Sequence, residues 1–306
     1  MPEGRIALGI DVGGSKVALV LLDADGGVVV EQRLANRNYA DARALLEAVA
    51  HAALELTDAR SPGSTLEGVG VGICELVGVS GLIESSTTIP WTRADLEGAL
   101  LGIGPLTLDA DVRAAARAEA VFGAGRSFPS FGYVTVGTGI SSTFVRDGEP
   151  WTGAHGAAQL LGSAHIALPC PHCGRMLDTC LEDVASGAGI VRRYRERSGR
   201  EVAGSDEVIE AAAGGDEDAS AVVSEAADTL GSFIALFANL FDPHAMVIGG
   251  GLASGPSPFL ERVLATGRSR IWAPSARSMP ILVGELGANA GAIGAAWSVL
   301  AGERTG

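Results

Sequence analysis

Short apolar runs separated by glycine turns or single charges open the chain and predict β-strands. Strands are expected at residues 6–10, 16–23, 27–34, 68–73, 106–108, 133–136, 142–147 and 245–248. Apolar residues at helical spacing predict helices over 42–56, 112–122, 181–197, 219–241 and 290–300. Gly26 and Gly27 are interpreted as a hairpin turn within an opening antiparallel meander. This mixture of strands and helices predicts an α/β fold.

The second half of the chain repeats the opening theme, a strand followed by a glycine turn and another strand. Because 306 residues are many for a single core, two lobes are expected. We predict an N-terminal lobe over 1–115 and a C-terminal lobe over 116–289, joined by a hinge within packed structure, since no low-complexity linker separates them. The helix within 290–306 is expected to pack back on the first lobe.

Two clusters of small residues, each directly after a predicted strand, are the strongest chemical signal. The first holds Gly13, Gly14, Ser15 and Lys16, the only lysine of the chain; the second holds Gly137, Thr138 and Gly139. A glycine turn at the end of a strand lets backbone N–H groups approach an anion closely. One such turn is weak evidence, but one in each half predicts phosphate binding. A third turn, with Gly249, Gly250 and Gly251, offers bare backbone to a base and ribose.

Composition narrows the choice of partners. A formal net charge of −14 argues against long nucleic acid, whose phosphates are bound by basic surfaces, whereas a small anion held by backbone dipoles is compatible. Hydrophobic residues make up 47% of the chain, yet glycine or charge is expected to break every apolar run before membrane-spanning length. No signal peptide is recognised, so a cytoplasmic protein without a membrane partner is predicted.

Three of the four cysteines lie close together and predict a metal site. Thiolate and imidazole groups at short spacing suit tetrahedral zinc, and three cysteines with one histidine would close a structural site. The candidate ligands are His165, Cys170, His172, Cys173 and Cys180. Either histidine could supply the nitrogen ligand, and the alternative is a loop with unligated thiols.

Taken together, the motifs resemble the ROK family of repressors, open reading frames and sugar kinases. The strings that carry the resemblance are 9–16, 122–126, 137–140, 249–251 and 287–296, in this order over essentially the whole chain. The resemblance implies the two-lobed actin-like ATPase (ribonuclease H-like) fold shared with hexokinases. Each lobe would hold a mixed sheet flanked by helices, with a cleft between the lobes.

The resemblance also implies roles for single residues. Asp11 would organise Mg²⁺ or its water, turns 13–16 and 137–139 would hold the phosphates of ATP, and 249–251 would lie near the nucleoside. Asp111 would be the general base for the acceptor hydroxyl. A helix N-cap is the alternative for Asp111, since aspartate fills that position well. Typical members carry a Glu-Asn-Asp-Ala-Asn type string here, and its first asparagine is replaced by Ala110.

Sugar contacts are implied for Asp111, Glu182, His165 and Gln159. Glu182 matches a family glutamate, although an acidic residue in the first turn of a helix is the alternative. Gln159 stands near the place of a usual glutamate, with extra residues around it. The family's order of zinc ligands favours His165 over His172, but the spacing from Cys173 to Cys180 is longer than usual, so the geometry must differ.

The expected activity is that of an ATP:hexose 6-phosphotransferase from a bacterial source. The altered contacts point to a modified or amino hexose such as kanosamine; a glucokinase or an N-acetylmannosamine or N-acetylglucosamine kinase is the alternative. A non-catalytic sugar-binding regulator is a further alternative. A repressor would need a DNA-binding segment ahead of the first phosphate strand, and polyphosphate remains open as a donor. A homodimer is compatible with the sequence.

Overall fold

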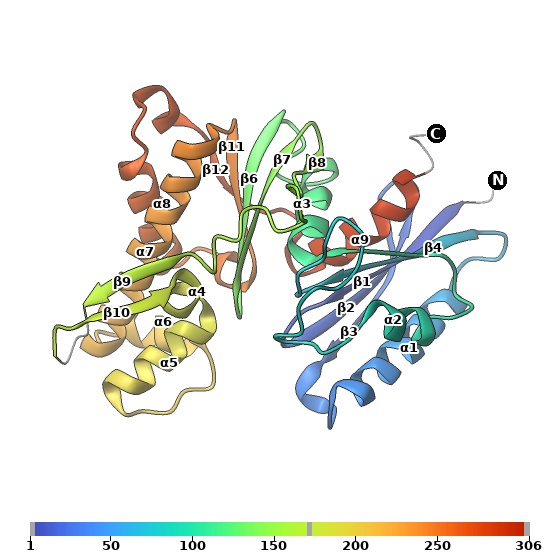
Figure 1. Ribbon diagram of the computed structural model, residues 1–306, viewed down its shortest axis with the longest axis horizontal. Helices are drawn as coiled ribbons and strands as arrows, with labels where there is room; N and C mark the ends of the chain where they lie inside the picture. Colours follow the sequence, from blue (N-terminus) through green and yellow to red (C-terminus); the bar gives the residue numbers. More distant parts are fainter. Residues whose placement is uncertain (1–3, 170–172, 303–306) are drawn as a thin grey trace. The chain divides into compact units, whose positions relative to one another are not determined.

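The computed structural model describes residues 4–169 and 173–302. Its chain forms two compact units (Figure 1). Unit 1 comprises Met1–Ser127, Val145–Ala158 and Glu285–Gly306, and unit 2 comprises Phe128–Phe144 and Gln159–Gly284. The lobe boundaries expected from the sequence, 1–115 and 116–289, stay a prediction.

Unit 1 is built on a five-stranded mixed sheet with the strand order β3-β2-β1-β4-β5. Its strands are β1 (Arg5–Val12), β2 (Lys16–Asp23), β3 (Val28–Ala35), β4 (Thr65–Ile73) and β5 (Leu106–Ala110). Strand β1 is antiparallel to β2 and parallel to β4, which is in turn parallel to β5. The opening meander predicted from the apolar runs is confirmed.

The two faces of this sheet carry different helices (Figure 1). Large side chains such as Ile6 and Leu8 of β1 pack with α1 (Ala42–Asp58) and with Leu96 of α2 (Arg93–Ala99). Ala7 of β1 faces the other way and packs with α9 (Ala290–Ala301). Successive residues of a strand point to opposite faces, so β1 presents bulky residues on one side and small ones on the other.

Helix α9 comes extraordinarily close to β1 and β4 because both strands present glycine on that face. A Cβ on Gly9 would lie 1.9 Å from the carbonyl oxygen of Ala292, and one on Gly70 would lie 1.8 Å from that of Ala295. Helix α3 (Asp111–Val121) approaches α9 in the same way, because a Cβ on Gly294 would lie 1.7 Å from the Ala114 carbonyl oxygen. These glycines are required by close backbone contact rather than by turn geometry.

The second sheet has the strand order β12-β11-β6-β7-β8. It is formed by β6 (Ser130–Val136), β7 (Ile140–Arg146), β8 (Glu149–Pro150), β11 (Ala245–Gly249) and β12 (Ile281–Val283). In each sheet the first strand is central, its next two strands lie on one side, and the later two lie on the other. This repeated topology agrees with the repeat expected from the sequence.

Helices and a hairpin surround the second sheet. They are β9 (His165–Pro169), β10 (Met176–Cys180), α4 (Leu181–Ala185), α5 (Gly187–Ser198), α6 (Ser205–Ala213), α7 (Glu217–Phe241) and α8 (Pro258–Arg270). Short 3-10 helices are η1 (Asn36–Asn38), η2 (Gly251–Ala253), η3 (Pro274–Ser278) and η4 (Gly287–Asn289). The hairpin β9–β10, α6, α8 and β12 were not anticipated from the sequence.

The single helix expected over 181–197 is wrong. Ser186 has extended backbone angles and separates α4 from α5, and its hydroxyl accepts a hydrogen bond from the Gly189 N–H as an N-cap. A serine whose side chain satisfies a free N–H group favours a new helix start over a continuous helix.

Helix α7 is the core helix of unit 2. Within the described residues it is the one helix long and apolar enough to pass as a membrane span, contrary to the expectation that every apolar run is too short. More than half of that apolar stretch is buried inside the protein, as in a core helix. Phe237 and Ile234 are among its fully buried residues, which explains its hydrophobicity by packing.

The glycine face of β1 predicts a sharp stability test. Replacing Gly9 by alanine should lower the free energy of unfolding by about 2–4 kcal/mol, because its Cβ would overlap the α9 backbone. The matched control is Gly98→Ala in the exposed part of α2, where a Cβ meets no atom within 4 Å. That control should gain about 0.5–1 kcal/mol. Urea denaturation of both variants measures this, and equal stabilities would contradict the close packing.

Candidate functional site

Asp11 lies near the end of β1, on the face that carries α9. In the sheet it is paired with Ala18 of β2 and with Gly72 of β4. A Cβ on Gly291, in the first turn of α9, would lie 2.4 Å from the Asp11 carboxyl carbon. The Asp11 carboxylate therefore occupies the space that glycine leaves at the start of α9.

Turn 13–16 connects β1 with β2. It is closed by a hydrogen bond of 3.0 Å from the Gly13 N–H to the Lys16 carbonyl oxygen. Asn36 of η1 holds it from outside, because its side-chain amide donates to the Gly13 carbonyl at 2.9 Å and its own N–H donates to the Ser15 carbonyl at 3.0 Å. Gly14, Ser15 and Lys16 are exposed. The predicted phosphate turn is thus an exposed loop with a fixed shape.

Asp111 begins helix α3 directly after β5. The capping position belongs to Ala110, which has no capping side chain, while the Asp111 carboxylate accepts a hydrogen bond of 2.6 Å from the Val112 N–H. The N-cap alternative for Asp111 is therefore wrong. A Cβ on Gly72 would lie 3.3 Å from the Asp111 Cα, so Gly72 is next to both Asp11 and Asp111.

The two carboxyl groups have raised pKa values. Burial raises the pKa of Asp11 to about 6, against the lowering effect of the Lys16 ammonium. Burial and the nearby charge of Asp11 raise the pKa of Asp111 to about 7, against the Val112 hydrogen bond and the Arg113 charge. Like charges held close together in a partly buried place disfavour double ionisation. The pair therefore titrates near neutral pH.

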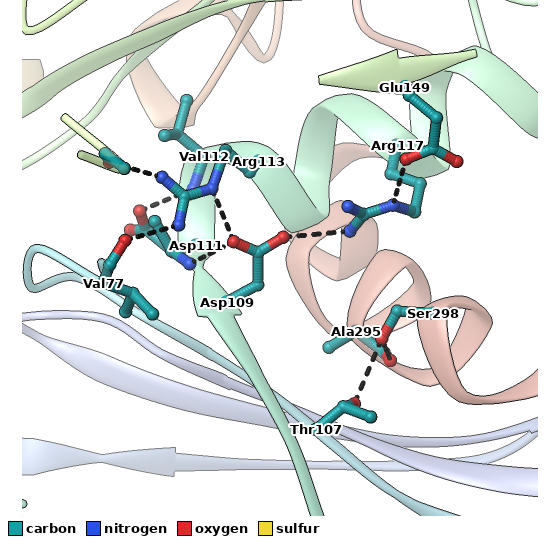
Figure 2. A network of polar contacts seen from close by, with 12 residues as sticks. Val77, Thr107, Asp109, Asp111, Val112, Arg113, Arg117, Glu149, Ala295 and Ser298 are labelled. Carbon is teal, nitrogen blue, oxygen red and sulfur yellow. Dashed lines mark hydrogen bonds and ion pairs between the residues drawn. The ribbon is translucent and has the colours of Figure 1, made fainter. Parts of the chain in front are cut away.

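A buried guanidinium stands beside this pair. Arg113 is only 7% exposed, and it donates to the Asp109 carboxylate at 2.5 Å, to the Val77 carbonyl at 2.8 Å and to the Gly156 carbonyl at 2.7 Å. Figure 2 shows Asp109 between Arg113 and Arg117, which donates to it at 3.1 Å. Through its bonds to the Val77 and Gly156 carbonyls, Arg113 ties two loops of unit 1 to α3.

The other glycine turns lie together in unit 2. Turn 137–139 joins β6 with β7, and turn 249–251 follows β11, which is parallel to β6. A Cβ on Gly250 would lie 2.3 Å from the Val136 carbonyl oxygen, and Gly250 has a φ of +89° that only glycine adopts easily. The ends of parallel strands meet at one sheet edge, so the two turns form one surface.

Glu182 and Gln159 are engaged within unit 2. The Glu182 carboxylate accepts a hydrogen bond of 2.7 Å from the Ile140 N–H and lies against Gly139. The Gln159 side-chain oxygen accepts from the Phe144 N–H at 3.0 Å, while its backbone oxygen accepts from the Ser142 hydroxyl at 2.5 Å. Glu182 thus supports turn 137–139, and Gln159 supports β7. Their roles as sugar contacts stay predictions.

The expected zinc ligands do not come together in the described part of the chain. His165 and Cys180 are cross-strand neighbours at the base of the β9–β10 hairpin, whereas Cys173 lies in the connection between the two strands. His165 contacts Asp178 at 3.0 Å. Cys170 and His172 lie outside the described residues. No cluster of three metal-ligating side chains occurs among residues 4–169 and 173–302.

The Cys180 thiol has a polar partner in the structure. It donates a hydrogen bond of 3.2 Å to the Asp183 carboxylate, and burial raises its pKa. A zinc ligand must instead be a thiolate. The zinc site therefore stays a prediction.

Comparison with known proteins decides the family. The sequence model of the ROK family matches residues 7–301. The chain belongs to the ROK family. The expected α/β fold, the two-lobed actin-like ATPase fold with a mixed sheet in each half, is confirmed by solved ROK structures.

A glucokinase from Halalkalibacterium halodurans is 29% identical to this chain, and the match covers 96% of this chain and 95% of the relative. The crystal structure of a ROK hexokinase from Thermus thermophilus matches with a TM-score of 0.79 and 30% identity, over 98% of this chain and 100% of that one. A ROK family glucokinase from Streptomyces griseus, solved with glucose and AMPPNP, matches with a TM-score of 0.76 and 26% identity, over 95% and 98%.

The carboxylate pair of this ROK protein fits a divalent cation. Mg²⁺ prefers oxygen ligands, which the Asp11 carboxylate supplies, and the charge of Asp11 raises the pKa of the neighbouring Asp111. A cation bound there would relieve that repulsion.

Two residues that organise this ROK site escaped the sequence analysis. Asn36 follows a strand without any motif around it, and its contact with turn 13–16 depends on the β2–β3 pairing. Arg113 lies two positions after Asp111 in an alanine-rich helix. A charged residue at such a place could have indicated a partner for the nearby carboxylates.

The raised pKa of Asp111 predicts a pH-dependent stability cost. The ionised group is less stable in the fold than in water, so its contribution is favourable below about pH 4 and is lost as the pH rises through about 7. Asp111→Asn should therefore raise the free energy of unfolding by on the order of 2 kcal/mol at about pH 8 and by little at about pH 4.

Urea denaturation across this pH range measures the difference. Asp58→Asn, the same change at an exposed carboxylate of α1, is the control and should show no such trend. An Asp111→Asn protein less stable than wild type at about pH 8 would contradict the raised pKa.

Proposed function

We propose that this ROK family protein is an ATP-dependent sugar kinase that phosphorylates the 6-hydroxyl of a glucose-type hexose, with Asp111 as general base. The observation that carries the proposal is the pairing of Asp111 with Asp11 beside the Gly13 turn, with the pKa of Asp111 raised to about 7. A base that titrates near neutral pH takes a hydroxyl proton effectively. The nearly full-length similarity to a glucokinase and a ROK hexokinase supports the same activity.

In the proposed reaction the Asp111 carboxylate accepts the proton of the sugar hydroxyl. The hydroxyl oxygen then forms a bond to the γ-phosphorus of ATP, the bond from that phosphorus to the bridging oxygen breaks, and ADP leaves. Asp11 would hold Mg²⁺ or its bound water, and Mg²⁺ would neutralise charge on the phosphates. Lys16, exposed at the end of the turn, would add positive charge for the same purpose.

The turns of both units suit the nucleotide. Turn 13–16 and turn 137–139 would receive phosphates, and turn 249–251 would receive the nucleoside, because bare glycine backbone allows close approach. Their fixed shapes support this assignment: the Gly137 N–H is bonded to the Gly139 carbonyl at 2.9 Å, and the Gly187 N–H to the Gly137 carbonyl at 2.8 Å. A turn whose shape is already fixed needs no rearrangement when the phosphate arrives.

The sugar is proposed to be a modified or amino hexose such as kanosamine. Ala110 offers only a methyl group where typical members carry an asparagine, and the Gln159 oxygen is already bonded to Phe144. A pocket with fewer hydrogen-bond partners discriminates poorly for an unmodified hydroxyl. A glucokinase, or an N-acetylmannosamine or N-acetylglucosamine kinase, is the alternative, and Glu182 and His165 are its further candidate contacts.

The remaining expectations have unequal support. The proposal places the enzyme in the bacterial cytoplasm, where ATP and sugars meet, and a homodimer is part of the expectation. Structural zinc stays part of the expectation, with His165 and Cys180 paired across the β9–β10 hairpin as two of its candidate ligands. A non-catalytic sugar-binding regulator is disfavoured by the presence of Asp11, Lys16 and Asp111 together.

An ADP-release assay tests the activity. With Mg·ATP and a panel of glucose, kanosamine, glucosamine, mannose, N-acetylglucosamine and N-acetylmannosamine, we expect a strong preference for one sugar. Asp111→Asn should lower kcat by on the order of 10²–10⁴-fold with sugar binding retained, since it removes the base alone. Asp58→Asn is the matched control with wild-type turnover. Turnover on no sugar, with binding detectable, would refute the kinase assignment for these acceptors, and polyphosphate in place of ATP checks the donor.

The pH profile of kcat/KM gives a second test. Because the base must be ionised, the rate should rise with pH through the joint titration of Asp11 and Asp111, between about 6 and 7. Raising the Mg²⁺ concentration should move this rise to lower pH, because a cation favours the ionised carboxylates. A profile that is flat from about pH 5 to 8 would speak against the assignment.

A further inference from the structure

A buried carboxylate outside the Asp11–Asp111 pair holds a whole segment of unit 1. Glu75 follows β4, is only 5% exposed, and has four hydrogen-bond donors around it. Its Oε1 accepts from the Thr88 N–H at 2.5 Å and from the Ile89 N–H at 2.8 Å. Its Oε2 accepts from the Thr87 N–H at 3.0 Å and from the Ser85 hydroxyl.

These contacts keep Glu75 ionised. Burial alone would raise its pKa, but the bonds from Ser85 and from the backbone of 87–89 outweigh burial and lower the pKa. Charge-assisted hydrogen bonds of this kind are stronger than neutral ones. The carboxylate thus fixes the backbone of segment 85–89, whose residues 86–88 are exposed and belong to no helix or strand.

Segment 85–89 is anchored at its far end as well. Ile89 and Trp91 are buried in the core between the sheet and α1, and the Trp91 indole donates to the Ala42 carbonyl at 2.9 Å. At its near end the Ser85 hydroxyl accepts from the Leu76 N–H at 2.9 Å. With both ends of the segment fixed, the position of the Glu75 carboxylate determines where Thr88 lies.

Thr88 of this segment lies directly on turn 13–16. A Cβ on Gly14 would come within 2.9 Å of Thr88 Cγ2, so the threonine methyl fills the space over Gly14. Cys74, directly before Glu75, lies near the end of β1 and the carboxylate pair. The Cys74 N–H donates to the Val12 carbonyl at 2.9 Å, and burial, followed by the charges of Asp111, Glu75 and Asp11, raises the pKa of the Cys74 thiol.

We propose that Glu75 is a positioning residue for the phosphate-binding turn: it holds segment 85–89 so that Thr88 supports Gly14 from above. This inference rests on the proposed function, because it takes the nucleotide phosphates as the ligand of turn 13–16. Glu75 does not touch the ligand and acts through Thr88. A turn displaced by a fraction of an ångström would present its backbone to the phosphates in a less favourable geometry.

Isothermal titration with Mg·ATP, without sugar, tests the proposal. Glu75→Gln turns one acceptor oxygen into an amide donor and removes the charge, so it should weaken Mg·ATP binding about tenfold. Glu84→Gln makes the same change at the exposed carboxylate directly before segment 85–89. It is the control and should bind Mg·ATP like wild type. Thermal melting of each variant separates lost binding from lost folding. A folded Glu75→Gln with wild-type affinity would overturn the proposal.

Thr88→Ser gives an independent variant that keeps every hydrogen bond of the Thr88 N–H and removes only the methyl group over Gly14. It should weaken Mg·ATP binding about threefold, and its effect should be less than additive with that of Glu75→Gln, since both act through one contact. If Glu75→Gln does not fold, Thr88→Ser decides alone. Wild-type affinity in Thr88→Ser, or full additivity, would refute the proposal.

The binding readout keeps this inference separate from the proposed function. A wild-type protein that binds Mg·ATP but phosphorylates no sugar refutes the kinase assignment while the Glu75 variants still test the turn. A wild-type kinase whose Glu75→Gln variant changes only the KM for sugar refutes the inference and leaves the kinase standing. A wild type that does not bind Mg·ATP refutes both.

Discussion

The close packing of α9 on the glycine face of β1 and β4 is the constraint on which unit 1 depends. A single methyl group on Gly9 or Gly70 would overlap an α9 carbonyl group by more than an ångström of normal contact distance. The same absence of side chains brings the start of α9 to Asp11, where Gly291 leaves room for a carboxylate. Dispersion contacts between backbones so close are dense, which gives a small-residue interface its stability.

The packing of α9 also places two carboxyl groups where their ionised forms are destabilised, and the proposed reaction needs both groups there. It brings Asp11 and Asp111 together around Gly72, where burial raises both pKa values and the charge of Asp11 raises that of Asp111 further. A fold optimised for stability alone would not hold two carboxyl groups in this way. Arg113 reduces this destabilisation, because its positive charge lowers the pKa of Asp111. Its guanidinium also fixes two neighbouring loops.

Carboxylates also support the turns in both units. Glu75 holds the segment that covers Gly14, and Glu182 accepts from the Ile140 N–H directly after Gly139. A glycine turn has high conformational freedom in the unfolded chain and few side-chain contacts of its own. Charge-assisted bonds from a carboxylate to nearby backbone or to an adjoining segment compensate for that freedom. In both units, therefore, a carboxylate that accepts backbone hydrogen bonds holds a glycine turn in place.

The sequence by itself determined the strands of the first sheet, the central strands of the second, the glycine turns at their ends and the family, because strand alternation and glycine turns are set by near neighbours along the chain. It did not determine the break at Ser186 or the β9–β10 hairpin, where local hydrogen bonds compete with helix periodicity and with the expected zinc ligands. Only the tertiary structure decided which carboxylates meet. Asp11 and Asp111 are 100 positions apart, and Glu75 binds the Thr88 N–H 13 positions further along the chain. Such proximity depends on strand order and on the depth at which α9 packs, which no short stretch of sequence encodes.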